Sequence, residues 1–451
     1  MSNRHLLMLG LFLVGGGLSS AACSDTQAVG IPDDAGAAGE TEHEGEAGAT
    51  GEGGAKGEAG AGGEAGATNP GGEGGAGGEG GEPPYEFPPS LNPQAVIVVA
   101  PPSTTSSDLL VGGTDYSSKS EIVSVTLNTG AVGDGETYED SDTVATSSAG
   151  LGFAIERTND KVHLLDAGKI STTFDLKAPS SNQTPVDKAY VPLLNQSLIA
   201  ILDLNRGKVS RWIDMNEYNA PGDSDHSADI AEGVYDPNTK IAYFLLQRID
   251  IGTYQGGHLP CSKSPGLIVG IDSKTDEVVD LNGDAAGKAI ELELVNPRSL
   301  SINADGSALY LLADGCYDGA KKIHSGVEVV DPTDGTTTVA YEADGSDALK
   351  SYYLSRMILT GGEDAVIESF HDDDFTTHWN KFDVAAGKVG AELKNVPQAV
   401  SFDGTDLLGV EISGKVGKVV RYKLATESST EISPTSWGGE YSFTSGTALV
   451  K

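Results

Sequence analysis

One acidic stretch of the chain combines residue types that bind metal ions. It places three aspartates and a histidine close together: Asp223, Asp225, His226 and Asp229. Carboxylate oxygens are the ligands that hard cations such as Ca²⁺ and Mn²⁺ prefer. The stretch precedes a strand-like segment near Gly233, so we predict a metal site in a loop that leads into a strand. A solvated acidic loop is the alternative, because the chain carries 66 acidic residues.

A second group of potential metal ligands lies later in the chain. It combines two histidines with three consecutive aspartates: His371, Asp372, Asp373, Asp374 and His378. Apolar segments precede and follow the group, which is the pattern of two strands joined by a turn. We therefore expect a hairpin tip whose charges remain in water, with a metal site as the alternative.

Several other chemistries find no support in the sequence. It has no Gly-x-Ser-x-Gly nucleophile motif, no His-Glu-x-x-His zinc motif, no Walker-type phosphate loop and no CxxCH haem motif. The formal net charge of −37 makes nucleic acid an unfavourable partner. The one cofactor that the sequence suggests is Ca²⁺, at the first acidic stretch.

The N-terminus has the features of an export signal. A short polar and basic start precedes the apolar run from Leu6 to Val14 and a region of small residues that ends at Ala22. The apolar run is about half as long as a membrane-spanning helix requires. We therefore expect residues 1–22 to be a signal peptide.

The predicted signal peptide is followed by a cysteine, Cys23, which comes after Ser20, Ala21 and Ala22. This arrangement resembles the lipobox of bacterial lipoproteins, although that family prefers Leu where this chain has Ser20. The resemblance implies that Cys23 carries a lipid that anchors the mature chain to a membrane. Ser24 resembles the pattern of outer-membrane sorting, so the expected location is the cell envelope, on its periplasmic or extracellular face. Ordinary signal cleavage is the alternative.

Residues 23–91 form a linker rich in glycine, alanine and glutamate. Glycine recurs at every third position over most of 45–81, a period that resembles collagen, but the tract has few prolines. Glutamates spread along a glycine-rich chain keep it solvated and extended. A random coil of this length spans roughly 45 Å. We predict a disordered tether between the membrane and a folded domain at 92–451.

The folded region retains two cysteines, Cys261 and Cys316, once Cys23 is assigned to the lipid. Export implies an oxidising compartment, where such a pair forms a disulfide. A disulfide between them would reduce the conformational entropy of the unfolded chain and so stabilise the native state by about 4 kcal/mol. We predict the disulfide, with two separate buried thiols as the alternative.

Residues 92–451 contain a repeated unit. One element is an X-Pro-Gln/Arg segment that leads into an apolar strand, at Asn92, Asn296 and Val396. The other is an apolar strand ended by an Asp-x-x-x-Gly turn. It occurs at 203–207, 331–335 and 383–387, with variants at 126–130 and 272–276 and degenerate copies near Gly168 and Glu427. These turns define seven units about 50 residues apart, each with room for four strands, which predicts an all-β seven-bladed β-propeller. Two β-sandwiches or a solenoid are the alternatives.

The best copy of the unit is Val329-Val330-Asp331-Pro332-Thr333-Asp334-Gly335. It resembles the blade motif of YVTN-repeat bacterial β-propellers, in which an apolar strand and an Asp-rich turn recur. The YVTN tetrapeptide itself is missing. The resemblance covers about residues 92–451 and implies a propeller at the cell surface or in the periplasm, whose activity varies among members of the family.

Two longer spacings between units predict extra loops near 253–261 and 315–324, which the disulfide would join. These loops contain aromatic and basic residues in an acidic domain: Tyr254, His258, Tyr317, Lys321, Lys322 and His324. Loops stiffened on a rigid scaffold commonly form binding surfaces. We mark Tyr254, His258, Tyr317 and His324 as candidate binding residues, with shielding of a blade edge as the alternative.

Together these features predict a lipid-anchored monomer that acts as a binding or scaffold module. Its partner would be a protein, a peptide or a glycan. The competing hypothesis is an enzyme, a Ca²⁺- or Mn²⁺-dependent lactonase or hydrolase with its site in the central channel. That enzyme would need carboxylates from different blades to converge on one point.

Overall fold

A computed structural model describes residues 90–451, except for short segments within that range. These segments are 103–104, 116, 181–182, 251–258, 260, 262–263, 284–286, 319–320, 344–348, 350–352, 372–375, 414–415 and 436–442. The predicted signal peptide, the lipidation site Cys23 and the predicted linker up to residue 89 lie outside the described residues. None of the helices in the described part has the length and apolarity that crossing a membrane requires.

The strands form seven blades, which confirms the predicted all-β propeller. Four blades consist of strands that follow one another along the chain. Blade 2 contains β5 (Thr143–Ser148), β6 (Leu151–Glu156), β7 (Lys161–Asp166) and β8 (Lys169–Asp175). Blade 4 contains β12 (Ile230–Asp236), β13 (Ile241–Leu246), β14 (Leu267–Asp272) and β15 (Glu277–Val279), and β16 (Ile290–Glu291) also pairs with β14. Blade 6 contains β23 (Tyr353–Gly361), β24 (Asp364–His371), β25 (Thr376–Asp383) and β26 (Lys388–Leu393). Blade 7 contains β27 (Gln398–Phe402), β28 (Leu407–Ser413), β29 (Val416–Lys423) and β30 (Ser428–Thr435).

The other three blades depart from this simple order. Blade 1 contains β2 (Asp108–Thr114), β3 (Ser120–Thr126) and β4 (Glu136–Tyr138), and its innermost strand is the C-terminal β31 (Phe443–Val450). Blade 3 contains β9 (Lys188–Leu193), β10 (Leu198–Asp203) and β11 (Lys208–Asp214), and its innermost strand is the N-terminal β1 (Ile97–Val98). Blade 5 contains β17 (Pro297–Ile302), β18 (Leu309–Ala313), β21 (Gly326–Val330) and β22 (Thr337–Glu342), with a hairpin of β19 (Cys316–Asp318) and β20 (Lys321–Ile323) inserted before β21.

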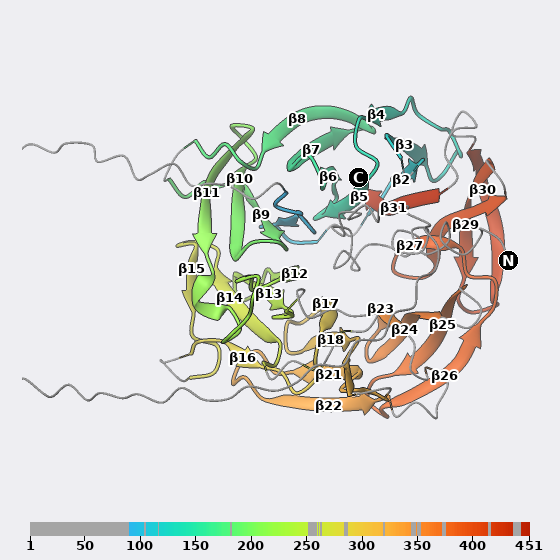
Figure 1. The fold of residues 1–451 in the computed structure, drawn as a ribbon. Helices are drawn as coiled ribbons and strands as arrows, with labels where there is room; N and C mark the ends of the chain where they lie inside the picture. The colour runs from blue at the N-terminus through green and yellow to red at the C-terminus, as the bar shows by residue number, and fades with distance from the viewer. Residues whose placement is uncertain are drawn as a thin grey trace, which may run out of the picture. The chain divides into compact units, whose positions relative to one another are not determined.

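The two ends of the folded chain therefore complete blades that begin elsewhere in the sequence. Figure 1 shows β31, in red, beside β2, in teal, and the blue N-terminal strand beside β9. Pairing β31 with β2 closes the ring, because it joins the last segment of the chain to the first full blade. A closed ring leaves no blade without a neighbour.

The core of the domain lies between the blades. Seven clusters of buried apolar side chains fill the seven contacts between neighbouring blades. The cluster around Val111 and Leu408 joins blade 1 to blade 7, so the ring is closed by packing as well as by strand pairing. Apolar residues on both faces of each blade are thus buried, which explains why the strands read as apolar runs.

The predicted turns all join the third strand of a blade to the fourth. Each has a residue with a positive φ near its end: Gly130, Gly168, Gly207, Asp276, Gly335, Gly387 and Glu427, and the turn with Gly168 has a second one, Ala167. Glycine is the default residue for this conformation because it has no Cβ. At Gly387 a Cβ would lie 2.0 Å from the carbonyl oxygen of Ala340 in blade 5, so this turn also requires close approach to the preceding blade.

Candidate functional site

Most of the predicted site residues belong to connections on one face of the ring, over blades 4 and 5. In blade 4, β12 begins where β13 ends and β14 begins, and blade 5 has the same arrangement of β17, β18 and β21. We call this the loop face. The acidic stretch precedes β12, and the two long connections follow β13 and β18, so all three lie at this face.

The predicted disulfide between Cys261 and Cys316 is confirmed. Their Cα atoms lie 4.7 Å apart, and the bond joins the long connection of blade 4 to that of blade 5. Two backbone hydrogen bonds reinforce it: Cys261 N–H donates to Tyr317 O at 3.3 Å, and Tyr317 N–H donates to Leu259 O at 2.8 Å. The two connections therefore form one unit on the loop face.

A buried lysine holds the inserted hairpin against the ring. Lys322 is 5 % exposed, and its Nζ lies 2.5 Å from Asp314 Oδ1, which also accepts the backbone N–H of Leu354. The same ammonium group lies 5.1 Å from the ring centre of Tyr353 and 6.0 Å from that of Tyr317. Cation–π contacts of this kind add to the ion pair. The hairpin is thereby fixed to the first strand of blade 6.

Two of the four candidate binding residues lie in the described part of the chain. Tyr317 is half-buried beside the disulfide, and His324 is exposed just after β20, where its Nδ1 lies 3.5 Å from Glu342 Oε1. Tyr254 and His258 lie outside the described residues. The structure thus places Tyr317 and His324 on the same inserted segment.

The predicted metal ligands are only partly brought together. Asp223 and Asp225 lie close to Asp250, which follows β13 and which the sequence did not suggest. His226 is exposed with a φ of 57°, and it is not part of this group. Asp229 is fully buried, and its Oδ2 accepts the backbone N–H of Ile249 at 2.9 Å.

Burial and neighbouring carboxylates both disfavour charge in this stretch. Burial raises the pKa of Asp223 to about 6, and the nearby Asp225 adds to the effect. Burial also raises the pKa of Asp229 well above its usual value, with the charge of Asp225 as the next cause. For both aspartates, the carboxylate is held out of water next to another carboxylate, and both conditions disfavour its charged form.

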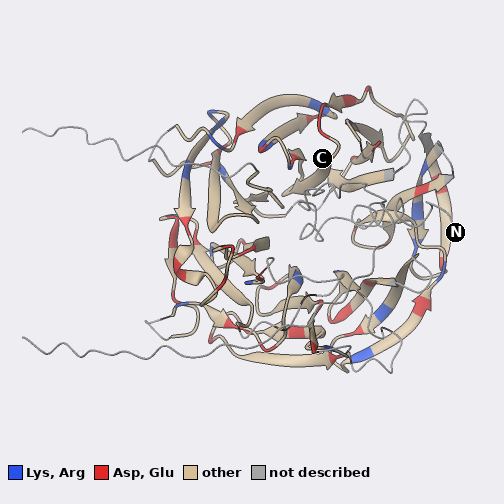
Figure 2. Cartoon of the chain, in the orientation of Figure 1, with Lys and Arg blue, Asp and Glu red and all other residues tan. Residues whose placement is uncertain are grey.

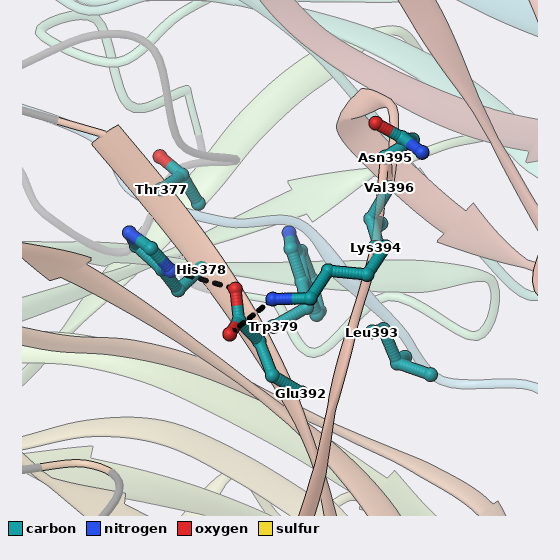
Figure 3. A pocket seen from close by; sticks show the side chains of 8 residues that line it. All are labelled: Thr377, His378, Trp379, Glu392, Leu393, Lys394, Asn395 and Val396. Atoms are coloured by element: carbon teal, nitrogen blue, oxygen red, sulfur yellow. Dashed lines mark hydrogen bonds and ion pairs between the residues drawn. The ribbon is translucent and has the colours of Figure 1, made fainter.

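The second predicted cluster lies largely outside the described residues. His371 ends β24, residues 372–375 are not described, and β25 begins at Thr376, so the cluster falls between two paired strands. His378 lies on β25 in a shallow groove of about 150 Å³, shown in Figure 3. There its Nδ1 lies 2.9 Å from Glu392 Oε1, and Lys394 Nζ lies 2.5 Å from Glu392 Oε2. The hydrogen bonds from Lys394 and His378 lower the pKa of Glu392.

A third group of charged residues lies at the inner strands and was not predicted. Arg356 on β23 is the cross-strand partner of Glu368 on β24, and its charge also acts on Glu232 on β12. Burial raises the pKa of both carboxyl groups to about 7. Glu232 accepts the backbone N–H of Leu300 at 2.7 Å, and Arg356 donates to Val400 O at 2.7 Å. These contacts link neighbouring blades.

Comparisons with known proteins identify no family for this chain. A scan against family models and a search of curated proteins each found no match. Among solved structures, the chain is similar to the β-propeller domain of Cps50 (Swd1) from Myceliophteria thermophila, with 12 % identity and a TM-score of 0.45 over 74 % of this chain and 94 % of that one. It is also similar to apo AztD from Citrobacter koseri, with 12 % identity and a TM-score of 0.42 over 76 % and 97 %. The chain is also similar to TolB from Acinetobacter baumannii, with 11 % identity and a TM-score of 0.36 over 74 % of this chain and 79 % of that one.

Proposed function

We propose that this protein is a binding module of the cell envelope. In this proposal a lipid on Cys23 anchors the chain, residues 23–91 act as a tether, and the propeller binds a protein, peptide or glycan through its loop face. The observation that carries the proposal is the disulfide-linked pair of connections on that face. An insertion joined by a disulfide on a closed ring is constrained before a partner arrives, so binding there requires a smaller loss of conformational entropy.

Charged residues of both signs surround this surface. Figure 2 shows acidic and basic residues around the whole ring. The described residues of the loop face include the acidic Asp223, Asp225, Asp250 and Asp318 and the basic Arg248, Lys322 and His324. Complementary charge increases the rate of association and selects among partners.

The alternative function, a metal-dependent lactonase or hydrolase in the central channel, stays a prediction. The inner-strand carboxyl groups described above, Glu232 and Glu368, both interact with Arg356. The positive charge of Arg356 makes the binding of a second cation by these carboxyl groups less favourable. We therefore develop the binding function further.

Site-directed photo-crosslinking in intact cells tests the binding surface. A photoreactive residue at His324, on the loop face, should give a discrete adduct with a protein or glycan. The matched control is the same residue at Asp334, which is exposed in the turn between β21 and β22 on the opposite face. The adduct should disappear when Cys261 and Cys316 are both replaced by serine. Equal adducts at both positions, or none at either, would contradict the proposal.

Membrane fractionation tests the anchor separately. Cys23→Ser removes the thiol that would carry the lipid, so the protein should move from the membrane fraction to the aqueous fraction. The thermal unfolding of the propeller should not change, because residue 23 precedes the described domain. A Cys23→Ser protein that stays with membranes would rule out lipidation as the anchor.

A further inference from the structure

The aspartates that meet on the loop face come from two separate connections. Asp223 and Asp225 precede β12, whereas Asp250 follows β13. One carboxylate oxygen from each lies within 4.8 Å of the other two. Two oxygens bound to one Ca²⁺ at about 2.4 Å lie at most about 4.8 Å apart, so the spacing of the three carboxylates is compatible with a single bound ion.

One of these carboxylates is buried without a partner for its second oxygen. Asp223 is 5 % exposed, and its Oδ1 accepts the backbone N–H of Asp225 at 3.3 Å. Its Oδ2 is buried, and no donor among the described residues forms a hydrogen bond with it. A carboxylate oxygen removed from water without a partner is costly, and the nearby Asp225 and Asp250 increase that cost. A cation at this point would remove it.

A fourth carboxyl group adds to this concentration of negative charge. The charges of Asp223 and Asp225 act on Asp229, and among the described residues its buried Oδ1 has no hydrogen-bond partner. Arg248 is the basic side chain that interacts with Asp223. Its guanidinium group donates to two backbone carbonyls, Pro265 O at 3.1 Å and Asn219 O at 3.4 Å. These bonds hold the guanidinium group to the backbone.

We propose that Asp223, Asp225 and Asp250 together bind one Ca²⁺ ion. The ligands are all carboxylate oxygens, which suit hard cations and not Zn²⁺ or Cu²⁺. Asp225 is exposed and Asp250 is half-buried, so water can fill the remaining positions of a coordination shell of six to eight oxygens. Mg²⁺ is less suitable because it requires near-octahedral geometry and gives up its waters reluctantly.

The ion would fix the connection that carries the disulfide. Asp250 and Cys261 both belong to the connection between β13 and β14. Ca²⁺ would tie one point of this connection to the segment before β12, and the disulfide ties another point to blade 5. The site does not depend on the binding function proposed above, because it can be measured without any partner.

Calorimetric titration of the full-length protein in detergent, after removal of metals with a chelator, tests the site. Ca²⁺ should bind with a stoichiometry of one and should raise the thermal unfolding midpoint by a few degrees, since a ligand of the native state stabilises it. Asp225→Asn and Asp250→Asn should each weaken Ca²⁺ binding at least tenfold. In chelator both variants should unfold at or above the wild-type midpoint, because each removes one of the clustered negative charges.

Asp305→Asn is the matched control. Asp305 accepts a hydroxyl hydrogen bond from Ser307, just as Asp250 does from Ser224, but it lies in an exposed turn of blade 5 outside the group. This variant should bind Ca²⁺ like the wild type. The proposal is overturned if the wild type shows neither heat nor a shift at about 10 mM Ca²⁺, above the Kd range of extracellular Ca²⁺ modules. It is equally overturned if Asp250→Asn binds Ca²⁺ as tightly as Asp305→Asn.

Discussion

Glu368 is a buried carboxyl group whose charge the fold disfavours. It is 2 % exposed, and its Oε2 has no hydrogen-bond partner among the described residues. Burial raises its pKa to about 7 even though Arg356 acts in the opposite direction. In the unfolded chain the same group releases its proton near pH 4.5. Between these two values the native state holds a proton that the unfolded state has lost, so the free energy of unfolding falls as the pH rises.

Glu368→Gln should therefore stabilise the protein at high pH and not at low pH. Glutamine resembles the protonated carboxyl group, so the variant and the wild type should be equally stable below about pH 4.5. Above pH 7 the variant should be more stable by roughly 1–3 kcal/mol. Denaturant unfolding of both proteins at pH 5 and pH 8 measures this difference.

Glu392 provides a control of opposite sign. Hydrogen bonds from Lys394 and His378 lower its pKa, so its charged form stabilises the native state. Glu392→Gln should lower stability slightly at neutral pH and lose this effect as the pH falls. A Glu368→Gln protein with the same pH dependence as the wild type would show that the buried carboxyl group is already compensated.

The candidate metal site shows what sequence spacing can and cannot reveal. Asp223 and Asp225, which their spacing placed in one predicted metal site, lie close together in the structure, since alternate residues of one loop can share a ligand. Asp250 was missed because it lies in a different connection, and only the antiparallel pairing of Ile230 with Leu246 brings the two connections side by side. Strand pairing belongs to the tertiary structure, and the spacing of ligands along the sequence does not show which strands will pair.

At the level of elements, the turn between the third and fourth strands also joins neighbouring blades. Where glycine is absent from the left-handed position, an acidic side chain takes its place and pairs with the preceding blade. Asp276 lies 2.5 Å from Lys188 Nζ and 2.6 Å from the Tyr190 hydroxyl oxygen of blade 3. Glu427 lies 2.9 Å from Lys381 Nζ of blade 6. The first pair is buried and the second is largely exposed.

These two turns should respond differently to restoration of glycine. Asp276→Gly relieves backbone strain but leaves Lys188 buried without its partner, so the free energy of unfolding should fall by about 3–5 kcal/mol. Glu427→Gly relieves the same strain and loses only a surface ion pair, so the change should stay within about 1 kcal/mol of zero. Thermal and denaturant unfolding of the two variants measure the contrast. Equal effects would mean that burial of the ion pair does not decide its contribution.

The turns were the most predictable elements of this fold. Their aspartates and glycines are required locally: Asp331 Oδ1, for example, accepts the N–H of Thr333, and Gly335 has a φ of 74°. Local requirements of this kind leave a mark on the sequence. The copies that end at Asp276 and Glu427 lack the glycine because an acidic side chain there makes contacts between blades.

For the whole molecule, strands from both ends of the folded chain complete blades 1 and 3, and the C-terminal β31 closes the ring. The segment Asn92-Pro93-Gln94 resembles the start of a first blade, but β1, which follows it, pairs with β9 of blade 3. The sequence could not show this, because innermost strands are short and apolar and their partners are chosen by tertiary packing. The same reason hides the pairing of β31 with β2.

The two closing strands should contribute unequally to stability. β31 pairs with β2 along most of its length, and its residues Ala448 and Val450 pack in the cluster between blades 1 and 2. Deletion of residues 443–451 removes this strand and separates blade 7 from blade 1, which exposes the edge of an open sheet. We expect this truncated protein to lose cooperative thermal unfolding and to aggregate.

Deletion of the chain up to residue 99 should leave a closed ring of lower stability. It removes β1 and the buried Leu91, whose N–H donates to Asp160 Oδ1 at 2.6 Å, but β31 still joins blades 1 and 7. Each buried apolar side chain lost costs about 2 kcal/mol, so the midpoint should fall while the transition stays cooperative. Calorimetry of both truncated proteins distinguishes the two roles. If the protein without β31 kept a single cooperative transition near the wild-type midpoint, packing between blades alone would be sufficient to close the ring.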